Sequence, residues 1–282
     1  MESSNFKESE SFNPYSVTAL SIYPIKSCQG IDLPEVELTP RGFKGDREFM
    51  LADNNGLFVN QKKYRKMAAM QVQQIAHGLL IDAPGMNTLE IDHNCDGDIQ
   101  EVEMYGEKFD ALKYYDPYAS EWFSHYLGGE VNLIRQSPLL TRRVTAKYAV
   151  DPNKDEVNLG DAYPIHLITE TSVKRLSEDA GEVIPFDRFR SNIIIPGKYP
   201  YNEDLWGQIK IGESVFRLVK AAYRCAITST NQHTGQIGKE PLKTLNRTRR
   251  FEKGVAFGQY LIPEGPYGKI KIGDRMELLK QK

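Results

Sequence analysis

Short apolar stretches, each followed by a cluster of turn-forming residues, make up most of the N-terminal half of the chain. Apolar, β-branched and aromatic residues recur or alternate with polar ones at residues 17–25, 35–38, 48–52, 79–81 and 88–91. Clusters rich in Gly, Pro, Asn and Asp separate them at residues 39–42, 53–56, 83–85 and 94–97. Short runs between turn residues are typical of strands, and their spacing predicts a β-barrel or a β-sandwich.

One segment changes to a helical period. Asp116 and Pro117 form a suitable N-cap and first helical position, and apolar residues then recur at helical spacing from Ala119 to Leu127. Gly128 follows, as glycine often does where a helix ends. The pattern predicts a helix, and we assign its aromatic side chains to the hydrophobic core rather than to a cofactor site.

The C-terminal half mixes strands with one further helix. Residues 136–147 are basic and polar without a period, which indicates a connecting loop. Residues 165–168 predict a strand that leads into a helix over residues 171–180. Further strands are predicted at residues 192–195, 209–211, 215–219, 256–262 and 269–279.

The whole pattern predicts a mainly β fold with a few helices, of the α+β class, in two halves. A polar tail, which we expect to be disordered, occupies residues 1–14. We place the N-terminal half at residues 15–135 and the C-terminal half at residues 136–282. A chain of 282 residues is long enough for two modest domains with hydrophobic cores.

Composition and charge fit a globular protein and exclude several kinds of partner. Hydrophobic residues make up 40% of the chain and charged residues 26%, which is ordinary for a soluble domain. A formal net charge of -2 attracts neither nucleic acid nor an anionic membrane, and no apolar run is long enough to span a bilayer. The polar, acidic N-terminus lacks the features of a signal or transit peptide, so we expect a cytoplasmic protein.

The three cysteines, Cys28, Cys95 and Cys225, are odd in number and far apart. They contain no CxxC pair, so the sequence supports neither a zinc ribbon nor a disulfide framework, and a reducing compartment suits them. Cys225 is unusual because it directly follows Arg224 inside an apolar and β-branched run. From the residues alone, a buried small side chain and a functional thiol both remain open for Cys225.

Two groups of motifs resemble the MOSC family. The first is IYPIKSC at residues 22–28, followed by RG at 41–42 and GDR at 45–47. The second is YRC at residues 223–225, with TG at 234–235, EPLKTL at 240–245 and FGQY at 257–260. Their order and spacing resemble an N-terminal MOSC β-barrel-like domain packed against a C-terminal MOSC β-barrel domain, over nearly the whole chain. The layout is most similar to the amidoxime-reducing branch, known from mitochondria and bacteria.

The resemblance implies a molybdenum cofactor (Mo-molybdopterin), held through its pterin phosphate and through one protein cysteine. By its match to the Arg-Cys motif, Cys225 is expected to be the metal ligand and the catalytic residue. Thiolate suits a sulfur-rich metal site, and the neighbouring Arg224 lowers the cost of its charge. The cofactor-binding residues implied by the same match are Lys26, Ser27, Arg47, Ala162, Tyr163, Pro164, Arg190, Tyr223, Arg224 and Tyr260. Lys and Arg pair with phosphate, and a Ser hydroxyl can donate to it.

The implied activity is an oxidoreductase that reduces N-hydroxylated or other N-oxygenated compounds, such as amidoximes and hydroxylamines, by oxygen transfer to molybdenum. Three cysteines do not suffice for a plant-type iron–sulfur cluster, and no glycine-rich dinucleotide motif is present. We therefore expect an external haem, iron–sulfur or flavin protein as electron donor. A function of a different class also stays open: the protein could be a carrier of the cofactor or of sulfur, without turnover of its own. The reason is that the MOSC name derives from molybdenum cofactor sulfurases.

The chain departs from the family pattern in three places. Ala162 and Tyr163 replace small hydroxyl residues, so only backbone contacts to the cofactor are expected to survive there, and Tyr223 replaces a small residue. Residues 230–233 (TNQH) replace the usual Val-Asp-Pro, which affects the expected substrate preference. We interpret His233 as a solvated loop residue. We expect Cys28 to pack near the cofactor without ligating it, and Cys95 to be incidental. Tyr260 is either a pocket residue or an ordinary strand aromatic.

Overall fold

The computed structural model describes residues 15–93, 97–137, 139–147 and 149–282. Within these residues strands predominate, with three α-helices and four short 3-10 helices. This confirms the predicted mainly β fold with a few helices. The expected tail at residues 1–14 and the position of Cys95 lie outside the described residues.

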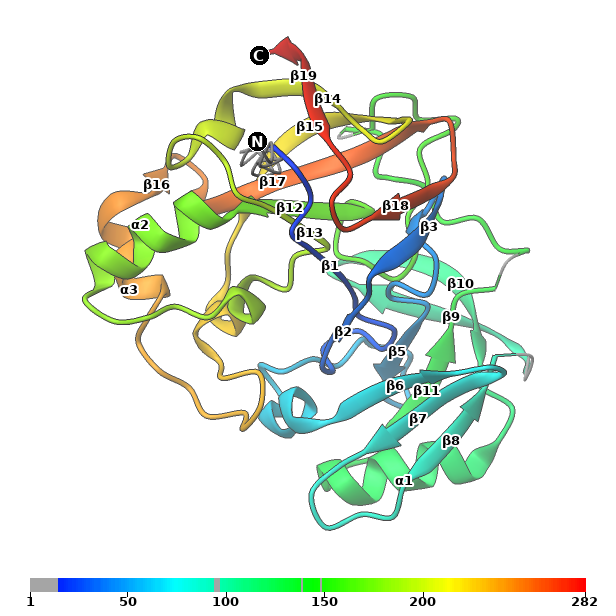
Figure 1. Cartoon of the computed structure of the whole chain (residues 1–282). Coiled ribbons are helices and arrows are strands. Elements are labelled where there is room, and N and C mark those ends of the chain that lie inside the picture. The colour runs from blue at the N-terminus through cyan, green and yellow to red at the C-terminus, as the bar shows by residue number, and fades with distance from the viewer. Residues whose placement is uncertain (1–14, 94–96, 138, 148) are drawn as a thin grey trace, which may run out of the picture.

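The largest sheet combines strands from both halves of the chain (Figure 1). Its order is β19-β14-β15-β17-β12-β13-β1-β2, and β16 pairs with β17 outside this path. Only β12 and β13 pair in parallel among these neighbours. The bounds are β1 Ala19–Ile22, β2 Ile31–Asp32, β12 Ile165–Thr169, β13 Ile193–Ile195, β14 Trp206–Ile211, β15 Ser214–Tyr223, β16 Arg250–Phe251, β17 Gly254–Gly265 and β19 Met276–Gln281.

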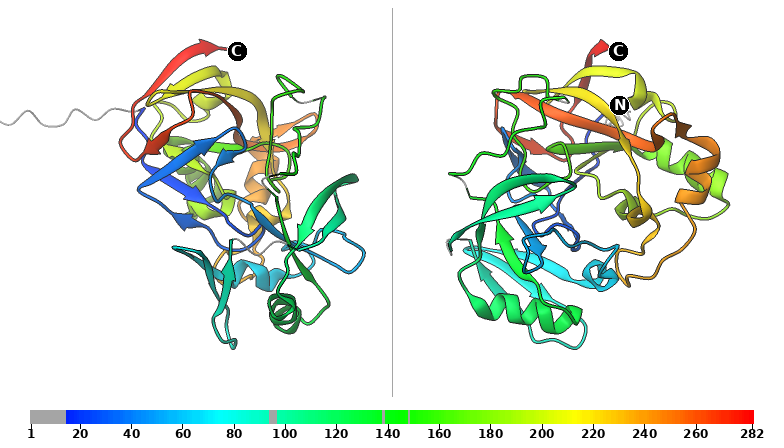
Figure 2. Two further views of the ribbon diagram at one scale, coloured as in Figure 1. Left: turned by 90° about the vertical axis from the view of Figure 1, so that its right-hand side faces the viewer. Right: turned by 180° about the vertical axis from the view of Figure 1, so that it is seen from behind.

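Three smaller antiparallel sheets complete the strand architecture (Figure 2). The first, in the order β5-β11-β10-β9, consists of β5 Phe49–Ala52, β9 Ile99–Met104, β10 Glu107–Lys113 and β11 Asn132–Arg135. The second, in the order β18-β3-β4, consists of β3 Glu35–Thr39, β4 Gly42–Phe43 and β18 Lys269–Lys271. The third, in the order β6-β7-β8, consists of β6 Gln71–Ile75, β7 Gly78–Asp82 and β8 Leu89–Asp92.

The helices begin and end at the residues that favour these positions. In α1 (Pro117–Leu127) the Asp116 carboxylate accepts a hydrogen bond from the Tyr118 N–H, and Gly128 takes the left-handed conformation at the end, as predicted. The second predicted helix is α2 (Glu170–Ala180), and α3 (Leu242–Thr248) lacked a clear signal. The 3-10 helices are η1 Arg65–Ala69, η2 Phe186–Phe189, η3 Asn202–Leu205 and η4 Ala226–Ser229.

The predicted single strand at residues 269–279 is wrong. The structure has two strands there, β18 and β19, which belong to different sheets. Between them Gly273 has a φ of 90°, and the Asp274 N–H donates to the Lys271 carbonyl, which closes a turn. An alternating pattern that is interrupted by one Gly-Asp pair is therefore better interpreted as two strands joined by a turn.

Both halves of the chain contribute to the core under the largest sheet. Leu20, Leu38 and Phe43 from the N-terminal half lie in one buried cluster with Trp206 and Phe216 from the C-terminal half. Strands β1, β3 and β4 therefore share a core with the C-terminal half, and Ile31 of β2 also packs against the cluster that contains residues of β6, β7 and β8. The division of the chain at residues 135 and 136 stays a prediction.

We predict that Phe43→Ala lowers the free energy of unfolding by about 3–5 kcal/mol, because it removes a fully buried ring from this shared core. Urea unfolding followed by tryptophan fluorescence measures the change. Phe251→Ala is the matched control, since Phe251 is 43% exposed and should cost far less. Equal losses for the two variants would show that the shared core does not depend on Phe43.

Candidate active site

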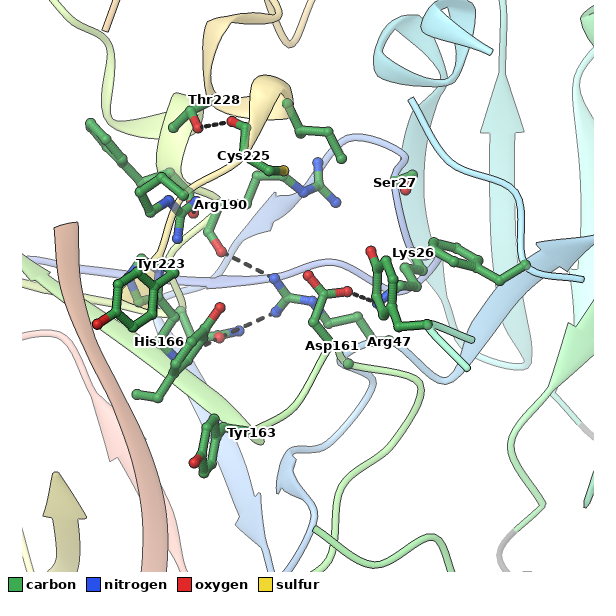
Figure 3. A pocket seen from close by; sticks show the side chains of 18 residues that line it. Lys26, Ser27, Arg47, Asp161, Tyr163, His166, Arg190, Tyr223, Cys225 and Thr228 are labelled. Carbon is green, nitrogen blue, oxygen red and sulfur yellow. Dashed lines mark hydrogen bonds and ion pairs between the residues drawn. The ribbon is translucent and has the colours of Figure 1, made fainter. Parts of the chain in front are cut away.

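A pocket open to solvent lies where turns from both halves of the chain meet (Figure 3). It is lined by Lys26, Ser27, Arg47, Phe58, Tyr105, Gly160, Asp161, Tyr163, His166, Phe189, Arg190, Asn192, Tyr223, Arg224, Cys225, Ile227, Thr228 and Tyr260. The structure thus brings together all of the predicted site residues except Ala162 and Pro164. Ala162 packs against an apolar cluster that contains Val157, and the Pro164 carbonyl faces Gly42, where a Cβ would lie 2.7 Å from it.

Four of the lining residues have a backbone conformation that residues other than glycine rarely adopt. Ser27, Arg47, Tyr105 and Arg190 have φ values of 73°, 49°, 55° and 53°. Each such residue costs about 1–3 kcal/mol, so the surrounding contacts must hold it in place. The Arg47 N–H donates to the Tyr23 carbonyl and the Arg190 N–H donates to the Asp187 carbonyl. Residues in such conformations cluster at functional sites, which supports the choice of this pocket.

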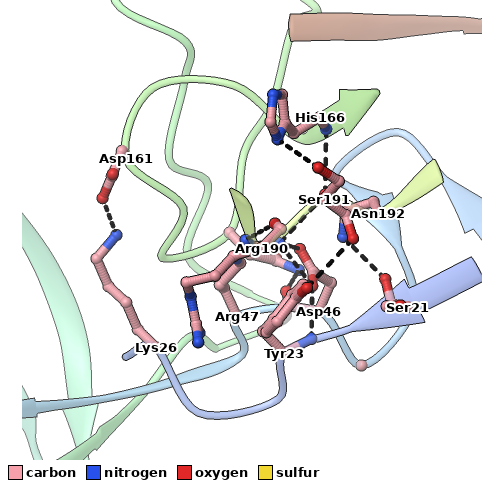
Figure 4. Close-up of polar contacts among 12 residues, drawn as sticks. Ser21, Tyr23, Lys26, Asp46, Arg47, Asp161, His166, Arg190, Ser191 and Asn192 are labelled. Atoms are coloured by element: carbon pink, nitrogen blue, oxygen red, sulfur yellow. Dashed lines mark hydrogen bonds and ion pairs between the residues drawn. The ribbon is translucent and has the colours of Figure 1, made fainter. Parts of the chain in front are cut away.

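Arg47 and Arg190 are held around the ring of Tyr23 (Figure 4). Their guanidinium carbons lie 4.5 Å and 4.3 Å from the centroid of that ring. Arg47 Nη1 donates to both carboxylate oxygens of Asp46, at 2.8 Å and 2.6 Å, and Nη2 donates to the Arg190 carbonyl at 3.1 Å. Asp46 therefore compensates the charge of Arg47, while the ring of Tyr23 supports both guanidinium groups.

Two arginines of the pocket lining retain buried donors without a partner among the described residues. Arg190 Nη1 donates to the Cys28 carbonyl at 2.6 Å and to Gln232 Oε1 at 3.1 Å, but Nη2 has no partner. Arg224 Nη2 donates to the Phe189 carbonyl at 2.8 Å, but Nε has none. Burial lowers the pKa of Arg190 to about 10. Unpaired buried donors are costly, so an acceptor in the pocket would stabilise this arrangement.

Lys26 lies deep in the pocket and forms an ion pair with Asp161. Burial lowers the pKa of Lys26 to about 8, although Asp161 opposes the shift. Nζ also lies 4.9 Å from the ring centroid of Phe58. Burial opposes the charge of Asp161, yet attraction by Lys26, Arg47 and other cations lowers the pKa of its carboxyl to about 2. The Asp161 side chain is 55% exposed, so water screens the outer side of this pair.

The segment that carries Asp161 is fixed by a buried arginine from the predicted connecting loop. Arg142 Nη1 donates to the Asn158 and Gly160 carbonyls at 2.8 Å and 2.7 Å. Asn158 Nδ2 donates to the Asp46 carbonyl at 2.9 Å. The backbone before Asp161 is therefore anchored to the turn that holds Arg47. Sequence patterns missed Arg142, because nothing in a basic loop marks one residue as buried.

Cys225 presents its thiol to the pocket from the position before η4. It is a free, exposed cysteine, and its carbonyl accepts hydrogen bonds from the backbone N–H and the hydroxyl of Thr228. Cys28 differs in each respect: it is fully buried, its Sγ lies 3.6 Å from Met70 Sδ, and burial raises its pKa to about 12. This geometry fits the expected packing role of Cys28 and makes Cys225 the accessible one of the two cysteines that the structure describes.

The structure adds lining residues that the motifs did not indicate. These are Phe58, Tyr105, Gly160, His166, Phe189, Asn192, Ile227 and Thr228. His166 Nε2 donates to the Phe257 carbonyl at 3.2 Å, and Nδ1 accepts from the Ser191 hydroxyl at 3.0 Å. Burial, with repulsion from Arg224, holds the pKa of His166 well below its usual value, so the ring is neutral. A histidine inside an apolar strand carries no sequence signal for this position.

The loop that departs from the family pattern contacts the predicted cofactor residues through a pair of amides. Gln61 Nε2 donates to Gln232 Oε1 at 3.0 Å, and Gln232 Nε2 donates back to Gln61 Oε1 at 3.2 Å. Both side chains are buried. Gln61 also donates to the Ser27 carbonyl at 2.7 Å, and Gln232 accepts from Arg190. The next residue, His233, has a 73% exposed side chain 3.1 Å from Asp187, which fits a solvated loop residue.

Two family models match the chain in sequence order. One describes a MOSC N-terminal beta barrel domain and matches residues 15–130, and the other describes a MOSC domain and matches residues 154–277. The chain belongs to the MOSC family.

Relatives of this MOSC protein include molybdenum cofactor sulfurases and mitochondrial amidoxime-reducing components. It is 30% identical over 260 residues to a molybdenum cofactor sulfurase from Oryza sativa. This alignment covers 85% of this chain and 31% of the sulfurase. It is 29% identical over 280 residues to the mitochondrial amidoxime reducing component 2 of Rattus norvegicus, which covers 92% and 82% of the two chains. Among solved structures, the YUAD protein of Bacillus subtilis matches with a TM-score of 0.43 and 11% identity over 93% of each chain. The MOSC protein spans about a third of the sulfurase.

We predict that anions bind the pocket more weakly as the pH rises through about 8, because Lys26 is protonated below its pKa of about 8 and neutral above it. Sulfate is a suitable probe, since its own charge stays constant over this range. Titration calorimetry of the cofactor-free protein at about pH 7 and about pH 9 measures the change. Lys26→Arg keeps its charge throughout and should lose this pH dependence. If sulfate affinity falls equally with pH in the arginine variant, the pH dependence comes from a group other than Lys26.

We predict that Gln232→Leu lowers the free energy of unfolding by about 1–3 kcal/mol, because it leaves the buried Gln61 amide without its partner. Replacing both glutamines by leucine should recover part of this loss, since neither amide then remains unpaired. Urea unfolding of the wild type, both single variants and the double variant gives the coupling. Strictly additive losses would show that the two amides act independently.

Proposed function

We propose that this MOSC protein is a molybdenum-cofactor-dependent oxidoreductase that reduces N-hydroxylated or other N-oxygenated compounds, such as amidoximes and hydroxylamines. The observation that carries the proposal is one exposed thiol, Cys225, in a pocket lined by four basic side chains. The rat relative is named for amidoxime reduction and aligns with most of this chain.

The pocket residues fit an anionic cofactor. The buried donors Arg190 Nη2 and Arg224 Nε have no partner among the described residues, and a phosphate or pterin oxygen or nitrogen would satisfy them. Lys26 and Arg47 add further positive charge to the lining, which also contains Ser27 (Figure 3). We propose that these residues hold the pterin phosphate and that Cys225 is the metal ligand.

Bound molybdenum would supply two-electron oxygen-atom transfer, and the chain would supply a ligand and a shaped site. Cys225 offers a soft sulfur ligand, and the hydrogen bonds from Thr228 to its carbonyl fix the backbone that carries it. Tyr163 and Tyr260 stack with ring centroids 5.2 Å apart and bound the pocket on one side. The neutral ring of His166 tilts against Tyr260 at 5.5 Å and limits its movement.

A second function has support from the sulfurase relatives. In this alternative the chain is a carrier that binds the cofactor, or a sulfur species on Cys225, without turnover of its own. The same exposed thiol and cationic lining would serve it. The departure from the family pattern at residues 230–233 favours this alternative, because that loop contacts Arg190 through Gln232.

We also propose that an external haem, iron–sulfur or flavin protein delivers the electrons, and that the protein acts in the cytoplasm. No helix in the described part of the chain is long and apolar enough to cross a membrane. The proposed domains are residues 15–135 and residues 136–282.

The test is to measure the molybdenum content of protein made in a host that supplies the cofactor. Reduction of benzamidoxime is then assayed with reduced viologen as a chemical donor. Bound molybdenum with turnover supports the reductase. Full molybdenum content without reduction of any N-oxygenated substrate would contradict the reductase proposal and support the carrier function.

We predict that Cys225→Ser abolishes this reduction, because a neutral hydroxyl is a poor substitute for thiolate at a soft metal. The variant should retain its fold and part of the pterin, which is also held through its phosphate. Cys28→Ala is the matched control and should remain active, since the Cys28 side chain only packs in the core. Wild-type turnover in the serine variant would show that Cys225 is not a ligand.

A further inference from the structure

Two carboxylates pair with the cations of the pocket, and they differ in how firmly they are held. Asp46 is buried, accepts two hydrogen bonds from Arg47 Nη1 and accepts a third from the Tyr23 N–H at 2.8 Å. Releasing Asp46 would break all three bonds and would leave a buried charge unpaired. Asp46 is therefore a permanent part of the structure.

Asp161 can leave its partner far more easily. Its side chain is 55% exposed, whereas the side chain of Lys26, with which it forms an ion pair, is only 8% exposed. The backbone before Asp161 is fixed by the bonds from Arg142 to the Asn158 and Gly160 carbonyls. Rotation of the Asp161 side chain into water would therefore release Lys26 without moving the segment.

Lys26 needs an anionic partner both before and after a ligand binds. A buried ammonium without a counter-charge is unfavourable, so the empty pocket requires a carboxylate at this point. A phosphate monoester carries a charge of about −1.5 to −2 and offers three acceptor oxygens, which exceeds what one carboxylate offers. An incoming phosphate would compete with Asp161 for the donors of Lys26 Nζ, and the two negative groups would repel each other there.

We propose that Asp161 is a resident counter-ion, which occupies the anion position beside Lys26 in the empty protein and is displaced when an anionic ligand group binds. It keeps Lys26 paired before binding, and it weakens anion binding because each ligand must first displace it. The inference rests on the cofactor-binding part of the proposed function. Asp161 lies in the stretch at residues 161–164 that matches cofactor-contacting positions of the family, and the role of counter-ion is not implied by that match.

The test uses sulfate as a probe and cofactor-free full-length protein. At about pH 6 Lys26 is protonated, and titration calorimetry then compares the wild type with Asp161→Asn. We expect sulfate to bind the asparagine variant about tenfold more tightly, since a charge-assisted contact no longer has to be exchanged. In a Lys26→Met background the same substitution should change sulfate affinity by much less, because the ammonium group for which Asp161 and sulfate compete is absent.

Asp179→Asn is the matched control, since Asp179 pairs with Arg175 on α2 and does not line the pocket. It should leave sulfate affinity unchanged. Thermal melting checks that each variant folds, and Asp161→Ser repeats the test if the asparagine variant does not. An Asp161→Asn protein that binds sulfate no better than the wild type, or a gain that persists with Lys26→Met, overturns the proposal. The measurement involves neither molybdenum nor turnover, so failure of the reductase proposal would leave its outcome intact.

Discussion

Compensation of positive charge is the constraint on which this site depends. Lys26, Arg47, Arg190 and Arg224 all line one pocket, where Lys26 is buried and the three arginines are partly buried. Clustered cations repel one another and lose hydration on burial, so each must gain contacts in return. Asp46, the ring of Tyr23, several backbone carbonyls and Asp161 supply these contacts, yet buried donors of Arg190 and Arg224 remain unpaired. The excess of positive charge and donors makes the pocket suitable for an anion.

The fold provides the rigidity that such a cluster requires. Ser27, Arg47 and Arg190 sit in left-handed turns, which persist only where the surroundings hold them. Those surroundings come from both halves of the chain, since β1 pairs with β13 and the two halves share the core that contains Phe43 and Trp206. The turns that follow β1 and precede β13 are thus brought to the same end of one sheet. The pocket is a consequence of this shared architecture.

The same cationic lining and accessible thiol would serve a reductase or a carrier, and the two groups of named relatives reflect this. In this chain the loop after Cys225 reaches Arg190 and Gln61 through Gln232, so a departure from the family pattern contacts a residue that we propose to bind the cofactor. Changes in this loop would therefore alter the position of a bound cofactor without altering the cofactor motifs.

The sequence by itself determined the features that depend on local patterns. Short alternating runs indicated the mainly β fold, Asp116 and Gly128 marked both ends of α1, and the family motifs identified the family and half of the pocket lining. Only the tertiary structure decided which distant side chains meet. The pairing of Lys26 with Asp161 joins positions 135 residues apart, and that of Gln61 with Gln232 joins positions 171 apart. Such contacts leave no period or spacing in a single sequence, because they depend on how strands from the two halves assemble into a common sheet.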